Sequence, residues 1–212
     1  MPSHQLTNAS LGQAVLDLSK RDNDLAKVVE RFGPPPMWGR RPEFATLVRI
    51  IIEQQVSLAA ARTMYKRLHA ATGTVTPESV HSIGIAGMRT LGFTGQKSSY
   101  CVGLAESILE GKLNLGAISR AETEKGRAML LTVRGLGVWS VDIYFLMALR
   151  RPDIWPHGDL ALADATHHVK RLPARPSYRE LTAMAEQWAP FRSVAARILW
   201  HHYLESRVVP VK

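Results

Sequence analysis

Apolar residues recur at spacings of three and four along most of the chain, which is the pattern of amphipathic helices. From Ala14 to Phe32 this spacing predicts one helix, which the following stretch GPPP at 33–36 ends. The next predicted helix begins near Pro42 and runs without a break to Gly73, a residue suited to the end of a helix. The first third of the chain is therefore predicted to be helical.

Further helix-start signals follow. Thr76 precedes a proline at the first helical position, Thr94 opens a second helix, and Ser119 opens a third. The β-like stretches TVT at 74–76 and RVVPV at 207–211 are too short to build a sheet. We therefore predict an all-α fold.

The chain is strongly basic. Its 212 residues, of which 46% are hydrophobic, are enough for one compact domain or two small lobes. The formal net charge of +9 favours a polyanionic partner, although charge alone does not separate nucleic acid from an acidic membrane surface. Lys97 and Arg192 could contact phosphate, but as scattered basic residues they are expected to add only to this basic field.

Cysteine usage and the length of apolar runs indicate the cellular compartment. Cys101 is the single cysteine and is expected to be a buried small hydrophobe. One thiol excludes a disulfide framework and an iron–sulfur cluster. No apolar run reaches membrane-spanning length, and the N-terminal MPSHQLTNAS lacks the pattern of a signal peptide. We expect a cytoplasmic protein, associated with the nucleoid in a bacterium, that does not bind membranes and is a monomer.

The stretch RGLGVWS at 134–140 predicts an anion site. Gly135, Leu136 and Gly137 form a tight turn, and Ser140 is placed to cap or begin the helix that follows. Amide groups at the start of that helix would bind phosphate, as in a helix–hairpin–helix unit that holds one DNA strand without reading its sequence. An ordinary tight turn between helices would have a similar sequence.

The stretch RPDIWPHGDLAL then places a carboxylate at the end of a stiff loop. Two prolines and a glycine precede Asp159, and an apolar helix follows it. Asp159 could simply cap that helix, and capping is compatible with a chemical role because a helix start stabilises negative charge.

These two stretches resemble the helix–hairpin–helix glycosylase superfamily, and within it the 3-methyladenine DNA glycosylase II branch. The resemblance extends to IIEQQVSLAAA, LGFTGQKSSYCVGLA and FRSVAARILW, in the same order, and covers roughly residues 43–202. It implies two helical lobes with a DNA cleft between them in a single domain, 1–212. Lobe one would comprise about 43–150 with the hairpin 134–140, and lobe two about 1–42 plus 159–212.

The resemblance also assigns roles to residues. Asp159 matches the catalytic aspartate that stabilises the oxocarbenium-like sugar or activates water. The hairpin residues match the phosphate-binding turn, whose carbonyls in this family can hold a cation. Trp139 stands where strand-cutting relatives carry a nucleophilic lysine, so a monofunctional enzyme is implied.

Trp139 and Trp200 match aromatic positions of the damaged-base pocket, where an indole attracts a cationic methylated purine. Both tryptophans would also suit a helical core. Gln55 matches the position whose side chain fills the gap left by the flipped base. Its neighbour Gln54 could also contact the DNA, or it could be an ordinary polar residue on the surface of a helix. Asp142 has no catalytic role and is expected to orient a neighbour or pair with a basic residue.

The function that follows is excision of alkylated purines, such as 3-methyladenine and 7-methylguanine, from duplex DNA in base excision repair. No strong general acid is required because a cationic base is already a good leaving group. No cofactor is expected. A glycosylase for deaminated or oxidised bases is the first alternative. The second is a DNA-binding module without catalysis, which Asp159 argues against because a carboxylate beside the hairpin would repel DNA.

Overall fold

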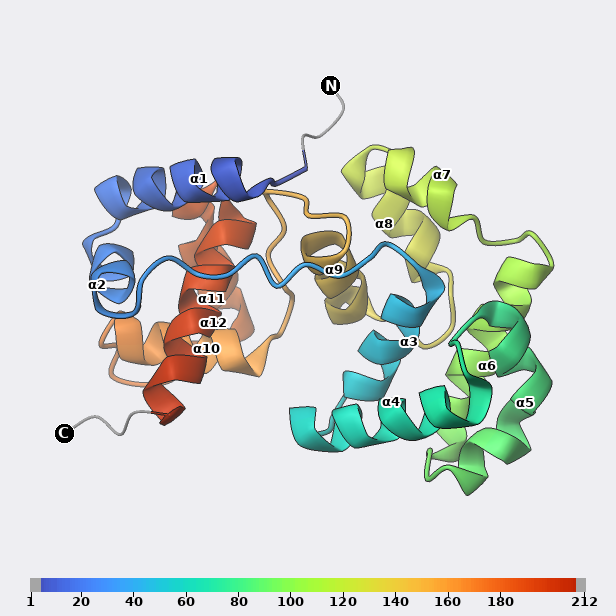
Figure 1. Cartoon of the computed structure of the whole chain (residues 1–212). Helices are drawn as coiled ribbons and strands as arrows, with labels where there is room; N and C mark the ends of the chain where they lie inside the picture. Colours follow the sequence, from blue (N-terminus) through green and yellow to red (C-terminus); the bar gives the residue numbers. More distant parts are fainter. Residues whose placement is uncertain (1–4, 209–212) are drawn as a thin grey trace. The chain divides into compact units, whose positions relative to one another are not determined.

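The computed structural model describes residues 5–208, and these residues are helices joined by loops, with no strand among them (Figure 1). The predicted all-α fold is confirmed. The chain forms two compact units. Unit 1 is Arg40–Tyr144, and unit 2 comprises the described parts of Ser3–Gly39 and Phe145–Lys212. Residues 1–4 and 209–212 of the predicted domain, including the end of RVVPV, lie outside the described residues.

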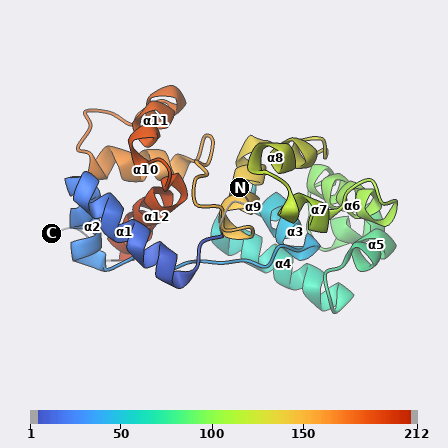
Figure 2. The ribbon, with the colours of Figure 1, turned by 90° about the horizontal axis from the view of Figure 1, so that it is seen from above.

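Unit 1 is built around one apolar helix. Its helices are α3 (Phe44–Glu53), α4 (Leu58–Thr72), α5 (Pro77–Thr90), α6 (Gly95–Leu109), α7 (Leu115–Arg120), α8 (Thr123–Leu131) and the first part of α9 (Val138–Met147). Helix α3 is buried on most of its circumference, with Leu47, Val48 and Ile50 fully covered. A helix with such a wide apolar face belongs in a core, and α3 packs against α4 and α6 with only Arg49 exposed (Figure 2).

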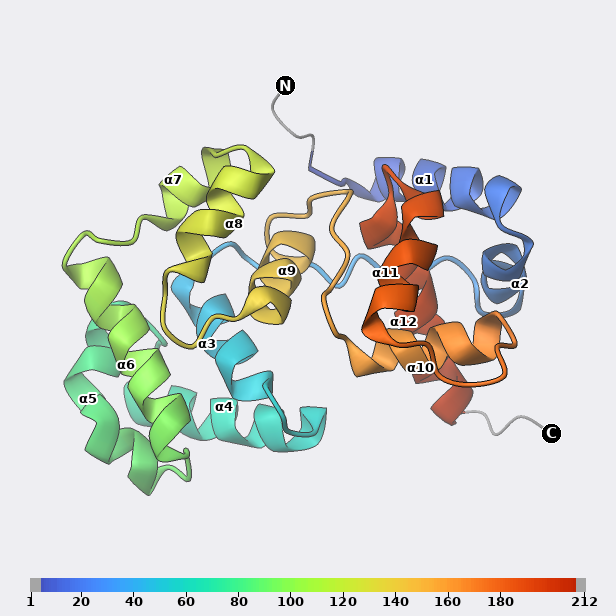
Figure 3. The same cartoon turned by 180° about the vertical axis from the view of Figure 1, so that it is seen from behind.

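Unit 2 joins both ends of the chain. Its helices are α1 (Asn8–Arg21), α2 (Asn23–Phe32), the end of α9, α10 (Leu160–Val169), α11 (Tyr178–Ala185), the 3-10 turn η1 (Glu186–Trp188) and α12 (Arg192–Val208). Helix α12 contacts α10, α2 and α1 and is therefore the central helix of the unit (Figure 3).

A buried polar cluster stabilises unit 2. The Asp22 carboxylate accepts hydrogen bonds from Lys170 Nζ at 2.6 Å and from Trp188 Nε1 at 2.8 Å. Burial alone would raise the pKa of Asp22, but the hydrogen bonds from Lys170 and Trp188 hold that pKa below its usual value. The cluster links the N-terminal helices to α10 and η1.

The local start and stop signals are confirmed. Thr76 and Thr94 cap α5 and α6 with their side chains, and Gly73 ends α4 with a φ of 70°. These signals depend on residues within four positions of one another, so the sequence is sufficient to locate them.

Three predicted helix runs are wrong because each is divided. The run from Ala14 breaks at Asp22, whose extended backbone and side chain cap α2. The run from Pro42 to Gly73 breaks after Glu53. Ser119 lies inside α7 rather than at a helix start, and Glu122 caps the separate α8.

Candidate DNA-binding and catalytic sites

The break between α3 and α4 places Gln55 at the tip of an exposed loop. Gln55 has a φ of 56°, a left-handed conformation that is unusual for a residue with a side chain. Its side chain is exposed, and so are those of Val56 (39%) and Leu58 (56%). The sequence predicted a continuous helix here, and the structure instead presents a polar side chain on a turn.

Gln54 points the other way and joins this loop to the glycine hairpin. Its Nε2 donates hydrogen bonds to the carbonyl of Gly135 at 2.9 Å and to the hydroxyl of Ser140 at 2.8 Å. The amide therefore sets the distance between the loop and the hairpin within unit 1. Contact of Gln54 with DNA stays a prediction.

A buried lysine of α6, Lys97, supports the same loop. Lys97 Nζ donates to the carbonyls of Ile52 and Gln54, the latter at 2.8 Å, at the C-terminal end of α3. A cation at this position satisfies helix-end carbonyls and interacts favourably with the helix dipole. Burial lowers the pKa of the Lys97 ammonium, opposed by the nearby Cys101. Lys97 is thus a structural residue, and the expectation that it only adds to the basic field is wrong.

The hairpin follows α8 directly. Gly135 has a φ of +95°, and its Cα faces the ring of Tyr100, so that a Cβ added here would meet Tyr100 Cδ2 at 2.6 Å. Leu136 is buried, whereas Gly137 is exposed and accepts the first α9 hydrogen bond, from the amide of Val141 at 3.0 Å. The first amides of α9 then lack helical partners, which is the geometry that binds anions.

Helix α9 begins two residues earlier than predicted. Ser140 lies inside it rather than capping it, and its hydroxyl is buried against Gln54. Trp139 is half-buried in the first turn of α9. Asp142 is 1% exposed and pairs with Arg127 at 2.8 Å, which confirms the predicted pairing with a basic residue. This ion pair fixes α9 to α8.

The hairpin does not suit a cation at the Gly135 carbonyl. Gln54 directs an amide N–H at the Gly135 oxygen, and this partial positive charge disfavours a metal ion there. No group of three or more His, Cys, Asp or Glu side chains in residues 5–208 could hold a metal ion.

Asp159 caps α10 in unit 2. Its Oδ1 accepts a hydrogen bond from the amide of Leu162 at 2.9 Å, and its side chain is largely buried. Gly158, with a φ of 69°, turns the chain immediately before it. Negative charge at this position is stabilised by the start of the helix.

The loop before Asp159 is fastened to the start of α12. The Ser193 amide donates to the carbonyl of Pro152 at 3.0 Å, and the Ser193 hydroxyl accepts from the amide of Ile154 at 2.9 Å. Arg192 binds Asp153 through two guanidinium nitrogens at 2.9 Å each. The expectation that Arg192 merely adds to the field is therefore wrong, because it secures this loop.

Trp200 completes the surroundings of Asp159. From the middle of α12 its indole Nε1 donates to Asp159 Oδ1 at 3.3 Å, and the residue is 8% exposed. The two residues are 41 positions apart, so sequence spacing carries no signal of this contact. Its consequence is a carboxylate oriented by two donors, one from its own helix and one from α12.

The chain matches the model of one protein family, described as the HhH-GPD superfamily base excision DNA repair protein, over residues 48–191. That span contains the exposed Gln55 loop, the hairpin and Asp159. This protein belongs to the HhH-GPD superfamily.

Relatives of this HhH-GPD protein cover most of its length. DNA-3-methyladenine glycosylase 1 of Schizosaccharomyces pombe is 27% identical over 90% of this chain and 87% of its own. A putative DNA-3-methyladenine glycosylase of Bacillus subtilis is 27% identical over 89% of this chain and 68% of its own. The solved structure of a 3-methyladenine DNA glycosylase of Schizosaccharomyces pombe, in complex with abasic DNA, has a TM-score of 0.83 at 24% identity and covers 94% of this chain and 99% of its own. That structure supports the HhH-GPD fold.

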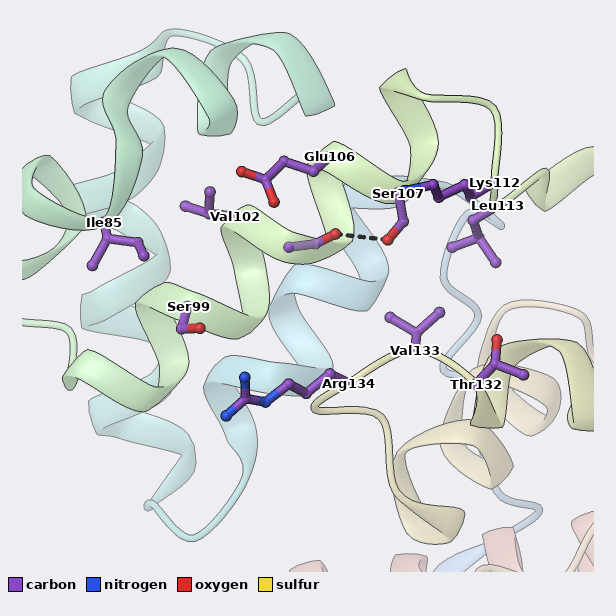
Figure 4. Close-up of a pocket in the computed structure, with 11 residues that line it drawn as sticks. Ile85, Ser99, Val102, Glu106, Ser107, Lys112, Leu113, Thr132, Val133 and Arg134 are labelled. Atoms are coloured by element: carbon purple, nitrogen blue, oxygen red, sulfur yellow. Dashed lines mark hydrogen bonds between the residues drawn. The ribbon is translucent and has the colours of Figure 1, made fainter.

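A cavity of about 480 Å³ lies in unit 1 of the HhH-GPD protein, beside the residues that lead into the hairpin (Figure 4). Helix α6 contributes Ser99, Glu106 and Ser107, and Arg134 lines the other side. The Ser107 hydroxyl donates to the carbonyl of Gly103 at 2.8 Å. The lining includes none of the residues predicted for the HhH-GPD site, which places this cavity outside it.

Sequence reasoning did not single out Arg197, a fully buried cation of this HhH-GPD protein. Arg197 is 0% exposed and donates to the carbonyls of Leu146, at 2.9 Å, and Met37. Burial, with a smaller contribution from Arg150, lowers the pKa of Arg197 to about 10. Arginine in an apolar helical stretch is a signal that could have found it, because such a residue is rarely buried without partners. Cys101, by contrast, is buried as predicted, and burial raises its pKa to about 12.

Proposed function

We propose that this protein is a monofunctional DNA glycosylase of base excision repair that removes alkylated purines from duplex DNA and leaves an abasic site. Membership of the HhH-GPD superfamily and two relatives named as DNA-3-methyladenine glycosylases support this. The observation that carries the proposal is Asp159, a largely buried carboxylate oriented by the Leu162 amide and the Trp200 indole.

Asp159 is the catalytic residue. Breaking an N-glycosidic bond develops positive charge on the sugar, and a fixed carboxylate in a poorly hydrated position lowers the energy of that state. The same carboxylate can accept a proton from the water that attacks the sugar. Two donors on one oxygen hold the group in place before the substrate binds, so little reorganisation is required.

Water is the nucleophile. A lysine would be needed for Schiff-base chemistry at the hairpin, and this chain has Trp139 at that position. Trp139 and Trp200 contact the flipped base, and their electron-rich faces favour a cationic methylpurine over a neutral base. No cofactor takes part in the reaction.

Three elements of unit 1 hold the DNA. The amides that follow Gly135, Leu136 and Gly137 bind a backbone phosphate near the lesion. Gln55 enters the space left by the flipped nucleotide, for which its exposed, left-handed turn is suited. Gln54 and Ser140 keep the phosphate site and this loop in register. The protein acts as a monomer in the cytoplasm, and in a bacterium it acts on the nucleoid.

The test is a base-release assay on methylated duplex DNA with the wild type and Asp159→Asn. We expect free methylpurines from the wild type only, and strand breaks only after alkali. Asp164→Asn is the matched control, since Asp164 lies on the same helix but pairs with Arg175.

Further duplexes separate the alternatives. Release of a deaminated or oxidised base, with none from methylated DNA, would reassign the substrate class. Binding of every duplex without release of any base would leave a DNA-binding module and overturn the role of Asp159. Strand breaks before alkali would contradict the monofunctional assignment.

A further inference from the structure

One face of α4 carries a stripe of basic and aromatic side chains. Residues at positions i, i+4, i+7, i+8 and i+11 share a face of a helix, and here they are Leu58, Arg62, Tyr65, Lys66 and His69. All are exposed except Tyr65, which is half-buried. Ala61 and Leu68 are buried and face the core of unit 1 instead.

A third positively charged side chain joins Arg62 and Lys66 from α3. The guanidinium carbon of Arg49 lies 3.9 Å from the centre of the Tyr65 ring, and Arg49 is exposed. A cation–π contact of this kind fixes a flexible side chain without neutralising its charge. We call Arg49, Arg62, Tyr65, Lys66 and His69 the α4 cationic face.

The segment of the sequence that carries α4 has no carboxylate. No aspartate or glutamate occurs from residue 54 to residue 77. Glu53, the acidic residue just before this segment, is bound by both terminal nitrogens of Arg40 at 2.9 to 3.0 Å. Within residues 5–208, no carboxylate lies within ion-pair distance of Arg49, Arg62 or Lys66. The positive charge of the face is therefore available to an anionic partner.

The face is continuous with the proposed lesion-binding loop. Helix α4 begins at Leu58, three residues after Gln55, and lies along the lower edge of unit 1 (Figures 1 and 3). Arg62 to His69 spans about 10 Å along the helix axis at 1.5 Å per residue. One DNA strand presents about three phosphates over that length.

We propose that the α4 cationic face binds the phosphate backbone of the duplex that flanks the lesion. This inference rests on the proposed function, because it takes Gln55 to mark the lesion. Since the contacts are to phosphates, they add affinity for any duplex sequence and do not take part in breaking the glycosidic bond.

The experiment measures the salt dependence of binding to a duplex with a stable abasic-site analogue. The test variant is Arg62→Ala/Lys66→Ala. The matched control is Arg67→Ala/Lys125→Ala, which also removes two charges from unit 1. Arg67 lies on another side of α4, near the carbonyl of Leu91, and Lys125 is exposed on α8, at the opposite edge of the unit (Figures 1 and 3).

Each phosphate contact contributes about −0.9 to the slope of log K against log salt concentration. We therefore expect the slope to become shallower by about 1.8 in the test variant and to change much less in the control. Equal changes in both variants would overturn the proposal, because they would indicate only a loss of net charge.

Single-turnover base release at saturating enzyme separates this proposal from the function it rests on. The test variant is expected to keep the wild-type rate, while Asp159→Asn loses base release but keeps the wild-type slope. If the wild type releases no base, the glycosylase function is refuted. The slope of log K against log salt concentration would still test whether the α4 cationic face binds DNA. A slower saturated rate in the test variant would refute a role confined to binding.

Discussion

Replacement of Gly135 by alanine tests whether the hairpin depends on a backbone that only glycine allows. The φ of +95° costs an alanine about 1 to 2 kcal/mol. The added Cβ would also lie 2.6 Å from Tyr100 Cδ2 and 2.7 Å from Tyr100 Cβ, so the ring must move. Overpacking of this kind costs about 1 to 3 kcal/mol. Together these predict a loss of about 2 to 5 kcal/mol in the free energy of unfolding.

Gly137→Ala is the control for that prediction. Gly137 has no heavy atom within 4 Å of a Cβ position, and its φ is outside the left-handed region. The substitution is expected to cost about 1 kcal/mol or less, as for a poor residue at a helix start. Urea denaturation followed by circular dichroism compares the two variants, and filter binding to duplex DNA reports on the hairpin.

A double-mutant cycle isolates the clash. Because Tyr100→Gly removes both the ring and the Cβ that the new methyl group would meet, the two substitutions together should cost about 1 to 3 kcal/mol less in the free energy of unfolding than the sum of their separate costs. The backbone strain remains in both backgrounds. A stability of Gly135→Ala within about 0.5 kcal/mol of the wild type, or additive losses in the cycle, would refute the reasoning.

Three other substitutions test further parts of the structure. Trp200→Phe removes the indole donor to Asp159 and should slow single-turnover base release about tenfold with little change in DNA affinity; an unchanged rate would exclude a positioning role. Lys97→Met leaves two helix-end carbonyls without their donor and should lower the free energy of unfolding by about 1.5 to 3 kcal/mol, measured by urea denaturation. Burial, with smaller contributions from His168 and Arg31, lowers the pKa of His202 below 6.5, so its contribution to stability is fully present above pH 6.5 and is lost as the pH falls through the folded-state pKa; in His202→Gln the free energy of unfolding, measured by urea denaturation, should fall less steeply as the pH drops below 6.5.

The sequence by itself determined the helical character and the ends that depend on neighbouring residues. Thr76, Thr94 and Gly73 act through hydrogen bonds or backbone angles within one turn of helix, so the residue type at one position is sufficient. The glycines of the hairpin and the loop before Asp159 were likewise found from local chemistry. A resemblance to a known family then assigned roles to these positions, and the family match confirms the superfamily.

Tertiary structure decided where α3 ends, whereas the start of α4 also has a local signal in Ser57, whose side chain accepts a hydrogen bond from the Ala60 amide. Apolar spacing continues through residues 54–57 without glycine or proline, so a local reading extends one helix. The break is held by Lys97, which reaches the carbonyl of Gln54 from α6, and by the Gln54 amide, which binds the hairpin 81 residues later. A left-handed turn at Gln55 costs free energy that only such distant contacts offset.

The same reason applies around Asp159. The role of Asp159 as a helix cap could be predicted because Leu162 is three residues away. Its contact with Trp200, 41 residues away, could not be predicted because it depends on how α12 packs on α10. Arg197 is buried because carbonyls of Met37 and Leu146, which are distant in sequence, converge on it. Sequence fixes which groups can bond locally, whereas packing selects the long-range partners because hydrophobic burial, not sequence proximity, brings them together.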